Sequence, residues 1–426
     1  MRLPVVDARL SRREALKVLG AAGAVTLAGC SSSQAAGSGQ QSGQGSGQAS
    51  DQVADAEPAA SLASPADAPA PQTTAERLLA SMTLEQKVAQ MLFVTPEQLA
   101  DVDVATEAGP LTQAGLADLP VGGVIYFGQN IEGDQQLRDM LANTVEFSRA
   151  AGAGIPVFTA TDEEGGTLVA RVANSGCFDV EQFPNMWWIG QEGDPSRAAE
   201  VGTSIGSYLR DIGFTLDFAP CADVLTNPQN PVIGHRSFSS DPEVCAVMVS
   251  AEVKAMLATG TQPCAKHFPG HGDTQGDSHT GAVYSYRTAD ELRECEYMPF
   301  QAAAEAGCPF IMVGHIETPN AAADGLPATL SPTMITDVLR GRLGFTGVII
   351  SDSMSMGAIS QNYEPGDAAV RFVEAGGDCV LMSPDPWAAR DGIIEAVTSG
   401  RLTEDRINES VARIIAAKQA AGLVEA

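Results

Sequence analysis

Basic residues are scarce in this sequence. Lysine and arginine together number 25 against 53 aspartates and glutamates, which gives a formal net charge of −28. Proteins that bind nucleic acid owe much of their affinity to basic groups facing phosphates, so this composition argues against a nucleic-acid partner. An acidic surface keeps a protein soluble through self-repulsion, and it does not by itself point to a substrate.

Cysteine motifs are also missing. The chain has eight cysteines, and none of them forms a CxxC pair or another metal-ligand spacing. Several lie in apolar runs, where a free cysteine behaves as a small hydrophobic residue. We therefore expect no structural disulfide.

The N-terminal apolar run is short. Residues 18–28 are too few to cross a bilayer stably, but they suit the central part of a signal peptide. Arg12 and Arg13 precede the run, as in a twin-arginine signal for the export of folded proteins, and Leu27-Ala28-Gly29-Cys30 resembles a bacterial lipobox. An ordinary amphipathic helix is the alternative. The order of the features favours a signal peptide over residues 1–29.

The same features predict an exported protein. Cys30 would become the lipidated first residue of the mature chain, anchored to the outer face of the cytoplasmic membrane by this lipid alone. Residues 30–72 are mostly Gly, Ser, Gln, Ala and Pro, and such a segment buries too little apolar surface to fold. We expect a disordered linker that holds the globular domain off the membrane, within reach of the cell wall.

The remaining residues, 73–426, alternate short β-rich runs with helical patterns. Most of the runs are continuously apolar, as expected of parallel strands buried on both faces. Eight such units favour a (β/α)8 TIM-like barrel, an α/β fold in one domain, over the alternative of an open doubly wound sheet. The expected strands are Val88–Val94, Val121–Phe127, Ile155–Thr161, Phe214–Ala219, Gln262–Phe268, Phe310–Ile316, Gly347–Ser351 and Asp378–Met382. The expected helices include Asp134–Ala151, Pro195–Asp211, Pro242–Thr259 and Ala289–Ala306.

Charged and imidazole side chains recur where these runs end. A barrel places its functional residues in the loops at the C-terminal ends of its strands. A single aspartate at such a position can be a helix N-cap, but N-capping does not account for the whole set. The set comprises Asp162, Asp217, Asp223, Lys266, His267, His315 and Asp352.

The segment 265–279 concentrates the chemistry of the chain. It holds three of the five histidines, together with aspartates, glycines and a proline. An aspartate paired with a histidine, here Asp277 with His279, fixes the imidazole tautomer and lets the ring transfer protons near neutral pH. Glycoside chemistry needs one nucleophile and one proton donor, and such a pair can serve as the proton donor. The expected hinge or turn positions of this segment are Gly270, Gly272 and Gly276.

A metal site is the alternative use of these side chains. Its ligands would come from His267, His271, His279, Asp273 and Asp277. Their spacings match no usual zinc site, so we expect neither a metal nor another cofactor.

Several motifs occur in a fixed order between about Thr83 and Ala417. They are Asp162-Glu163-Glu164-Gly165-Gly166, Phe218-Ala219-Pro220-Cys221-Ala222-Asp223, Gly234-His235-Arg236-Ser237-Phe238, Lys266-His267-Phe268-Pro269-Gly270-His271-Gly272-Asp273-Thr274 with Asp277-Ser278-His279, Pro327-Ala328-Thr329-Leu330-Ser331, and Gly347-Val348-Ile349-Ile350-Ser351-Asp352 with Met354 and Met356. With these motifs the sequence resembles the β-N-acetylglucosaminidase branch of glycoside hydrolase family 3.

The resemblance implies a retaining exo-β-N-acetylglucosaminidase that releases terminal β-linked N-acetylglucosamine from cell-wall fragments or related glycans. We expect the protein to be a monomer. Asp352 would be the nucleophile that forms a covalent glycosyl-enzyme, and His279, paired with Asp277, would be the acid/base. The residues implied to bind the sugar hydroxyls and the 2-acetamido group are Asp162, Arg236, Lys266 and His267.

The sequence also departs from the family pattern. Thr167 stands where relatives commonly have arginine, which leaves the role of Arg171 open, and Ser353 stands where they often have a second aspartate. Many members carry an αβα sandwich domain after the barrel, and because this sequence stops at Ala426 we expect that domain to be absent. Two other functions stay open. One is a phosphorylase of the same family, because a neutral histidine lets a phosphate anion approach, and the other is a lipid-anchored glycan-binding lipoprotein.

Overall fold

The computed structural model describes residues 73–425. The predicted signal peptide, Cys30 and the predicted linker lie outside the described residues, so those expectations stay predictions. Among residues 73–425 no helix combines the length and the apolar character that a membrane span needs. The cysteines of this part of the chain are all free thiols.

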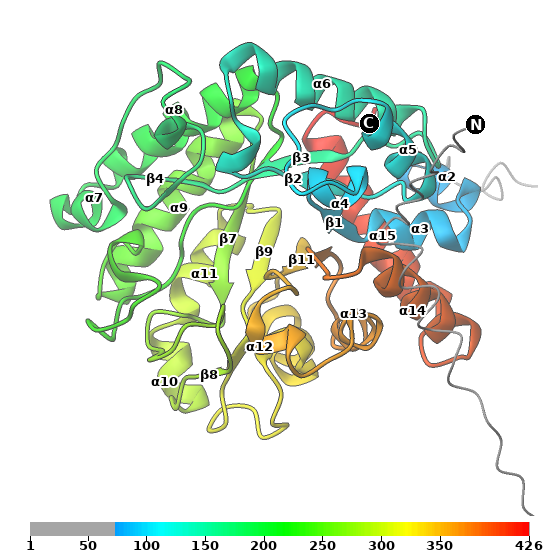
Figure 1. The fold of residues 1–426 in the computed structure, drawn as a ribbon. Coiled ribbons are helices and arrows are strands. Elements are labelled where there is room, and N and C mark those ends of the chain that lie inside the picture. Colours follow the sequence, from blue (N-terminus) through cyan, green and yellow to red (C-terminus); the bar gives the residue numbers. More distant parts are fainter. Residues whose placement is uncertain (1–72, 426) are drawn as a thin grey trace, which may run out of the picture. The chain divides into compact units, whose positions relative to one another are not determined.

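Eight parallel strands form the centre of the described domain (Figure 1). They are β1 (Leu92–Val94), β2 (Gly123–Ile125), β3 (Phe158–Thr161), β6 (Leu216–Asp217), β7 (Gln262–Phe268), β9 (Phe310–Val313), β11 (Val348–Ser351) and β12 (Val380–Leu381). From β1 to β11 each strand pairs with the next of these in the chain, and β1 also pairs with β12, which leaves β11 and β12 as the two ends of the sheet. This order confirms the predicted α/β barrel and contradicts the open doubly wound sheet, in which the strand order reverses.

The barrel is nearly closed between β11 and β12. Ile350 forms a parallel bridge with Cys379, and the N–H of Ser351 donates to the carbonyl of Cys379 at 2.9 Å. Beside this bridge the buried carboxylate of Asp378 accepts the N–H of Ile349 at 2.8 Å. The contact between β11 and β12 is therefore short, as in a sheet that has curled until its edges meet.

Helices surround the strands (Figure 1). They are α2 (Thr74–Ser81), α3 (Leu84–Gln90), α4 (Pro96–Ala100), α5 (Pro110–Asp118), α6 (Asp134–Arg149), α7 (Met186–Glu192), α8 (Pro195–Ile212), α9 (Pro242–Thr259), α10 (Ala289–Glu294), α11 (Tyr297–Glu305), the π-type helix η5 (Thr333–Arg342), α12 (Gly357–Ser360), α13 (Pro365–Glu374), α14 (Pro386–Thr398) and α15 (Glu404–Ala420). Short 3-10 turns are η1 (Gly128–Asn130), η2 (Ala173–Ser175), η3 (Gly234–Arg236) and η4 (Ala328–Leu330).

Two small sheets extend beyond the barrel strands. An antiparallel pair joins β4 (Glu163–Gly165) to β5 (Val169–Ala170), directly after β3. A parallel pair joins β8 (Val283–Tyr284) to β10 (Ile316–Glu317). Since β4 and β10 follow the C-terminal ends of β3 and β9, both small sheets build up the end of the barrel where the predicted site residues lie.

Two predicted elements were wrong in their bounds. The first predicted strand began at Val88, but Val88–Gln90 belong to α3, which begins with a capping box between Thr83 and Gln86. The predicted helix Ala289–Ala306 is broken between α10 and α11, where Cys295 has non-helical φ −133° and ψ −82°.

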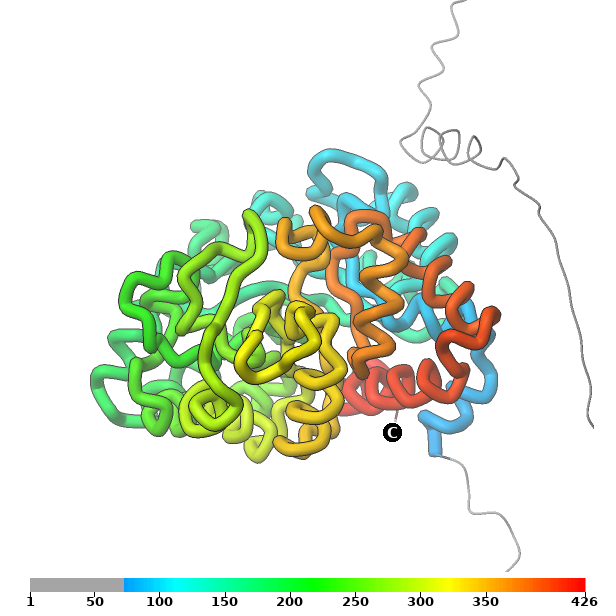
Figure 2. The backbone as a smooth tube through the Cα atoms, turned by 90° about the horizontal axis from the view of Figure 1, so that it is seen from below, coloured from blue at the N-terminus to red at the C-terminus, as the bar shows by residue number. Residues whose placement is uncertain are grey.

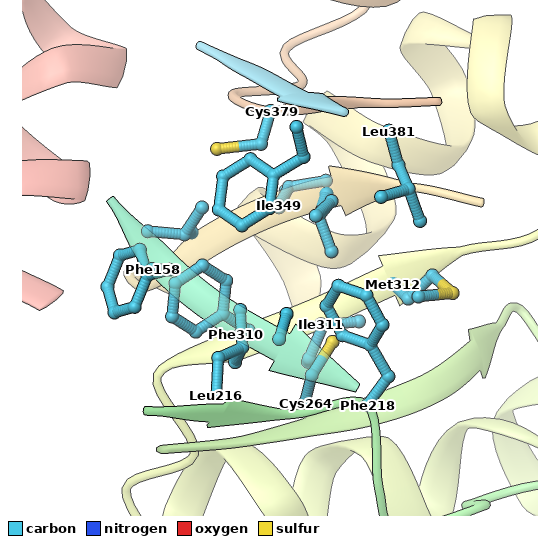
Figure 3. Packing of buried hydrophobic residues seen from close by; sticks show 14 of the residues in the cluster. Phe158, Leu216, Phe218, Cys264, Phe310, Ile311, Met312, Ile349, Cys379 and Leu381 are labelled. Carbon is cyan, nitrogen blue, oxygen red and sulfur yellow. The ribbon is translucent and has the colours of Figure 1, made fainter. Parts of the chain in front are cut away.

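Aromatic side chains fill the barrel interior (Figure 3). Phe158 of β3 and Phe310 of β9 meet edge to face with ring centroids 5.3 Å apart, and Phe93 of β1 stacks on Phe158 at 6.1 Å. Burying one such side chain contributes about 1.5–3 kcal/mol. These contacts connect strands from different parts of the barrel wall and make it a packed core.

The first and last helices of the domain lie side by side (Figure 2, blue and red). Lys87 of α3 and Glu404 at the start of α15 form an ion pair with 2.7 Å between Nζ and Oε1. Further along α15, the buried amine of Lys418 donates to the side chain of Gln90 and to the carbonyl of Pro156, both at 2.7 Å. The C-terminal helix therefore covers the barrel and links segments that precede β1 and β3.

Candidate active site

A cavity of about 340 Å³ opens at the C-terminal ends of the barrel strands. Its lining brings together most of the residues that the sequence singled out, from the end of β7 and from the loops after β3, β6, β7 and β11. These residues are Asp162, Arg236, Lys266, His267, His279 and Asp352. Asp277 does not line the cavity itself, but it holds His279, which does.

Two cations and two carboxylates form a buried cluster on one side of the cavity. Nζ of Lys266 lies 2.6 Å from Asp162 Oδ1 and 2.7 Å from Glu164 Oε1. Arg236 donates two hydrogen bonds to the Glu164 carboxylate, at 2.7 and 2.8 Å. Charge-assisted bidentate pairs of this kind fix geometry as well as charge. The ammonium and the guanidinium are therefore held in place at the cavity wall.

The pKa values in this cluster show that its charges stabilise one another. Burial raises the pKa of the Glu164 carboxyl, but Arg236 and Lys266 outweigh burial and hold that pKa far below its ordinary value. Burial likewise lowers the pKa of Lys266, but Asp162 and Glu164 outweigh it, and the net pKa is raised. Glu164 and Lys266 therefore stay ionised near neutral pH.

His267 is oriented by a buried aspartate. Its Nδ1 lies 2.8 Å from Asp223 Oδ2, and the other oxygen of Asp223 accepts the backbone N–H of His271 at 2.6 Å. Arg236 approaches His267 Nε2 at 3.4 Å, and because a guanidinium can only donate, Nε2 of a neutral ring must be the acceptor. Burial raises the pKa of Asp223, but His267 outweighs burial and the net pKa is lowered. The Asp223 contact and the Arg236 contact therefore fit the same tautomer of a neutral His267, with the hydrogen on Nδ1.

Asp352 directly follows β11 and faces the same cavity. Its Oδ1 accepts the backbone N–H of Ser353 at 2.7 Å. Burial raises the pKa of Asp352, but the imidazoles of His267 and His315 outweigh burial, and the net pKa lies below its ordinary value. His315 is held in turn by the carbonyl of Ser353, 2.9 Å from its Nε2. Asp352 is thus an ionised carboxylate poised at a strand end, as a nucleophile requires.

His279 and Asp277 form a close pair on the loop after β7. The ring Nδ1 of His279 lies 2.6 Å from Asp277 Oδ1, and the same oxygen accepts the His279 backbone N–H at 2.9 Å. Burial raises the pKa of Asp277, but the hydrogen bonds from His279 together outweigh burial and the net pKa is lowered. Since Asp277 occupies Nδ1, the ring nitrogen Nε2 remains for proton transfer at the cavity.

The glycines of this loop differ from one another in role. Gly270 has φ +126°, a conformation that other residues rarely adopt, and is a turn. Gly272 and Gly276 have no such φ, but a Cβ at Gly272 would lie 1.9 Å from the carbonyl oxygen of Val224, and one at Gly276 would lie 2.7 Å from Val283 Cγ1. The last two therefore also allow close packing of the loop, and Gly272 lies in a turn and Gly276 in a bend, as expected.

Sequence reasoning left Glu164 out of the site, although it stands two residues after Asp162. Alternate residues of a strand point to opposite sides, and in β4 this separates Glu164 from Glu163. Glu163 accepts the backbone N–H of Val172 at 2.7 Å and the hydroxyl of Tyr208 at 2.7 Å, so it supports the hairpin. The acidic triplet was the available signal, but it does not tell which glutamate faces the cations.

Arg171, whose role the sequence left open, lines the cavity. Its guanidinium lies over the ring of Phe127, 5.7 Å from the centroid, and one of its nitrogens is 4.0 Å from Asp162 Oδ2. Arg171 directly follows β5, so the β4–β5 hairpin ends by placing a cation at the cavity.

One group of possible metal ligands occurs within the described residues. Side-chain atoms of Cys221, Asp223 and His267 lie within 4.8 Å of one another. Both oxygens of Asp223 already accept hydrogen bonds, including two from backbone N–H groups, and the Arg236 guanidinium approaches His267 from the cavity side. The chemistry of this group is that of a hydrogen-bonded aspartate–histidine pair, and it shares only His267 with the ligand set that the sequence offered.

The profile of the Glycosyl hydrolase family 3 N terminal domain matches residues 83–417. The chain belongs to this family. Beta-hexosaminidase A of Pseudoalteromonas piscicida is 33% identical to the chain over 321 residues, which is 69% of this chain and 52% of that protein. Beta-hexosaminidase LpqI of Mycobacterium tuberculosis is 30% identical over 366 residues, 84% of this chain and 88% of that protein.

A solved structure of the same family also resembles this domain. It is a glycoside hydrolase family 3 beta-N-acetylglucosaminidase from Paenibacillus sp., with a TM-score of 0.75 at 36% identity, covering 80% of this chain and 63% of that one. This chain therefore spans about half the length of the Pseudoalteromonas family 3 relative and less than two thirds of the Paenibacillus chain.

Proposed function

We propose that this protein is a retaining exo-β-N-acetylglucosaminidase that hydrolyses terminal β-linked N-acetylglucosamine from glycans. The observation that carries the proposal is that Asp352 and His279, the two groups this reaction needs, line one cavity. The relatives named beta-hexosaminidase and the Paenibacillus β-N-acetylglucosaminidase support the substrate class. The cavity, at about 340 Å³, is at the small end of ligand pockets, which suits a single terminal sugar.

The reaction would proceed in two displacements. The Asp352 carboxylate attacks the anomeric carbon while the imidazolium of His279 gives its Nε2 proton to the glycosidic oxygen, and the aglycone leaves as an alcohol. The neutral His279 then takes a proton from water, whose oxygen attacks the same carbon and releases Asp352. Two inversions retain the β configuration. Asp277 would stabilise the imidazolium and keep the ring in the tautomer that presents Nε2.

The buried cluster would hold the sugar during both steps. Lys266 and Arg236 are fixed by carboxylates and still border the cavity, so they can donate to sugar hydroxyls without a large loss of side-chain entropy. Asp162 offers acceptor oxygens at the same wall, and His267 sits between this wall and the nucleophile. Such preorganisation places the anomeric carbon against Asp352 and accounts for much of the rate of an enzyme.

The activity test is a panel of aryl β-glycosides with the sugar varied, run with wild-type protein and with Asp352→Ala. We expect hydrolysis of the N-acetylglucosaminide above all others and loss of that activity in the variant. Full activity in Asp352→Ala would refute the proposal. Running the panel with and without inorganic phosphate separates hydrolysis from phosphorolysis, because a phosphorylase yields N-acetylglucosamine 1-phosphate. Binding of the glycoside by wild-type protein without turnover would instead support a glycan-binding lipoprotein.

We further propose that the protein acts on wall fragments or related glycans outside the cell, held at the membrane by a lipid on Cys30. This part rests on the sequence of residues 11–30. Mass spectrometry of the mature N-terminus tests it, since a diacylglyceryl-modified Cys30 is expected. Release of a Cys30→Ser variant from the membrane fraction would agree, and an unmodified N-terminus at another residue would contradict it.

A further inference from the structure

The loop that carries His279 is hydrogen-bonded through its backbone to the segment after Asp352. The N–H of Gly357 donates to the carbonyl of His279 at 3.1 Å, and the N–H of Ala358 donates to the carbonyl of Ser278 at 3.2 Å. Both donors belong to the first turn of α12. The position of the acid/base loop is thereby tied to the same segment that carries the nucleophile.

Gly357 allows this contact because it has no Cβ. A Cβ there would lie 2.9 Å from the carbonyl oxygen of His279 and 3.0 Å from the carbonyl carbon of Thr280. The third atom in its way, Gln361 Nε2 at 2.7 Å, ends a flexible side chain that can move aside. The carbonyl groups belong to the backbone, so a side chain at position 357 would push the loop away from α12.

Gln361 adds a side-chain contact to the two backbone ones. Its amide donates to the carbonyl of Thr280 at 3.3 Å. On the other side of the loop, Ser278 Oγ lies 3.1 Å from His271 Nε2. The bonds between Asp277 and His279 order the loop internally, but they do not fix its distance from the nucleophile, and the contacts with α12 do.

We propose that Gly357, Ala358 and Gln361 form a dock that sets the position of His279 relative to Asp352. The inference rests on the proposed function, in which His279 is the proton donor. None of the three residues would touch the substrate; they are positioning residues that act through the loop. A displacement of about 1 Å at a catalytic group can cost on the order of 100-fold in rate, so a small shift of the loop is measurable.

The test is Gly357→Ala, measured as kcat/KM on aryl β-N-acetylglucosaminides with leaving groups of different acidity. kcat/KM reports the glycosylation step, in which acid assistance matters most for poor leaving groups. We expect a loss of at least about tenfold for a phenyl leaving group and less than about threefold for a 2,4-dinitrophenyl one. Gly281→Ala is the matched control, since it lies in the same loop and its Cβ would meet nothing within 4 Å. It should leave both values unchanged.

Two further variants keep the test decisive if Gly357→Ala does not fold. Ala358→Pro removes the N–H that bonds to Ser278 and puts a ring carbon in its place, at a position in the first turn of a helix where proline is accepted. Gln361→Ala removes the side-chain bond to Thr280. Both should steepen the dependence on the leaving group, Gln361→Ala less than Ala358→Pro. An equal loss for both leaving groups, or no loss for either, in the folded variants overturns the dock.

The dock and the proposed function fail in different ways. If Asp352→Ala is inactive and the dock variants match wild type on every leaving group, only the dock is wrong. If Asp352→Ala keeps its activity, the proposed function is wrong, and the proposal of a dock is then wrong as well.

Discussion

The buried Glu164 allows a sharp test of how the cavity holds its cations. Glu164→Gln keeps the size of the side chain and removes its charge. Lys266 would then keep a single carboxylate partner, Asp162, and Arg236 would lose the carboxylate that it contacts with two nitrogens. Because Glu164 is 2% exposed, water cannot replace the missing charge.

The expected cost follows from this burial. Removing one partner of a buried ion pair costs about 3–5 kcal/mol, because the remaining charge stays buried without compensation. The pKa of Glu164 is lowered, so its stabilising contribution is fully present above its ordinary pKa and is lost only as the pH falls through the folded value. At pH 7 the whole cost applies, and we expect Tm to fall on the order of 5–10 °C. KM for an aryl N-acetylglucosaminide should rise as Lys266 and Arg236 lose their fixed positions.

Glu163→Gln is the control for this experiment. Glu163 is also buried, but it accepts hydrogen bonds from Val172 and Tyr208 and forms no ion pair within residues 73–425, and burial raises its pKa. The charge of Glu163 is therefore unfavourable in the folded protein, and it lowers stability as the pH rises through the folded pKa. Glu163→Gln should cost only about 1–3 kcal/mol in free energy of unfolding, because it disturbs a hydrogen bond and no ion pair. Differential scanning fluorimetry at pH 5 and pH 7 compares the two. If the Tm of Glu164→Gln lies within about 1 °C of the wild-type Tm, Glu164 does not stabilise the buried cations Lys266 and Arg236 as described.

Three further predictions concern the loop and the fold. His279→Ala should lower kcat/KM by about 10²- to 10⁴-fold for a phenyl leaving group and far less for 2,4-dinitrophenyl; equal losses would remove His279 as the proton donor. Gly270→Val should lower kcat more than it raises KM, since φ is +126° and a Cβ would lie 2.5 Å from Glu296 Cγ; wild-type kinetics would show that this turn does not position the loop. Burial lowers the pKa of Lys418 to about 7, so between pH 7 and pH 10 the unfolded chain binds a proton that the folded protein does not. The free energy of unfolding of the wild type, relative to that of Lys418→Met, should therefore rise by roughly 3 kcal/mol over this range. A difference between the two proteins that does not change with pH would contradict this.

The strands could be predicted because parallel barrel strands are apolar on both faces, and each predicted run contains an observed strand. The bounds were harder where a local signal competed, as at Val88–Gln90, where the capping box of Thr83 extends a helix into an apolar run. The break before α11 was not visible in the sequence, because the helical pattern continues across Cys295. The local hydrophobic pattern therefore predicted which segments are strands and which are helices, but it did not predict the boundaries that depend on tertiary contacts.

The candidate site shows the same division. Strand-end positions and the Asp277–His279 spacing indicated which residues would meet, and the cavity brings most of them together. The support around them could not be predicted, because Asp223 reaches His267 across 44 positions in the chain and Gly357 reaches His279 from another strand-end loop. Such contacts depend on how the barrel brings loops together, and no local pattern encodes them.

The central claim is that Asp352 forms a covalent bond with the sugar. The most direct measurement is peptide mass spectrometry after incubation with a slow fluorinated N-acetylglucosaminyl substrate, which lets the glycosyl-enzyme accumulate. The account predicts that the peptide containing Asp352 gains the mass of one sugar residue and that the product retains the β configuration by NMR. A label on another residue, or an unlabelled protein that releases the α anomer, would contradict it.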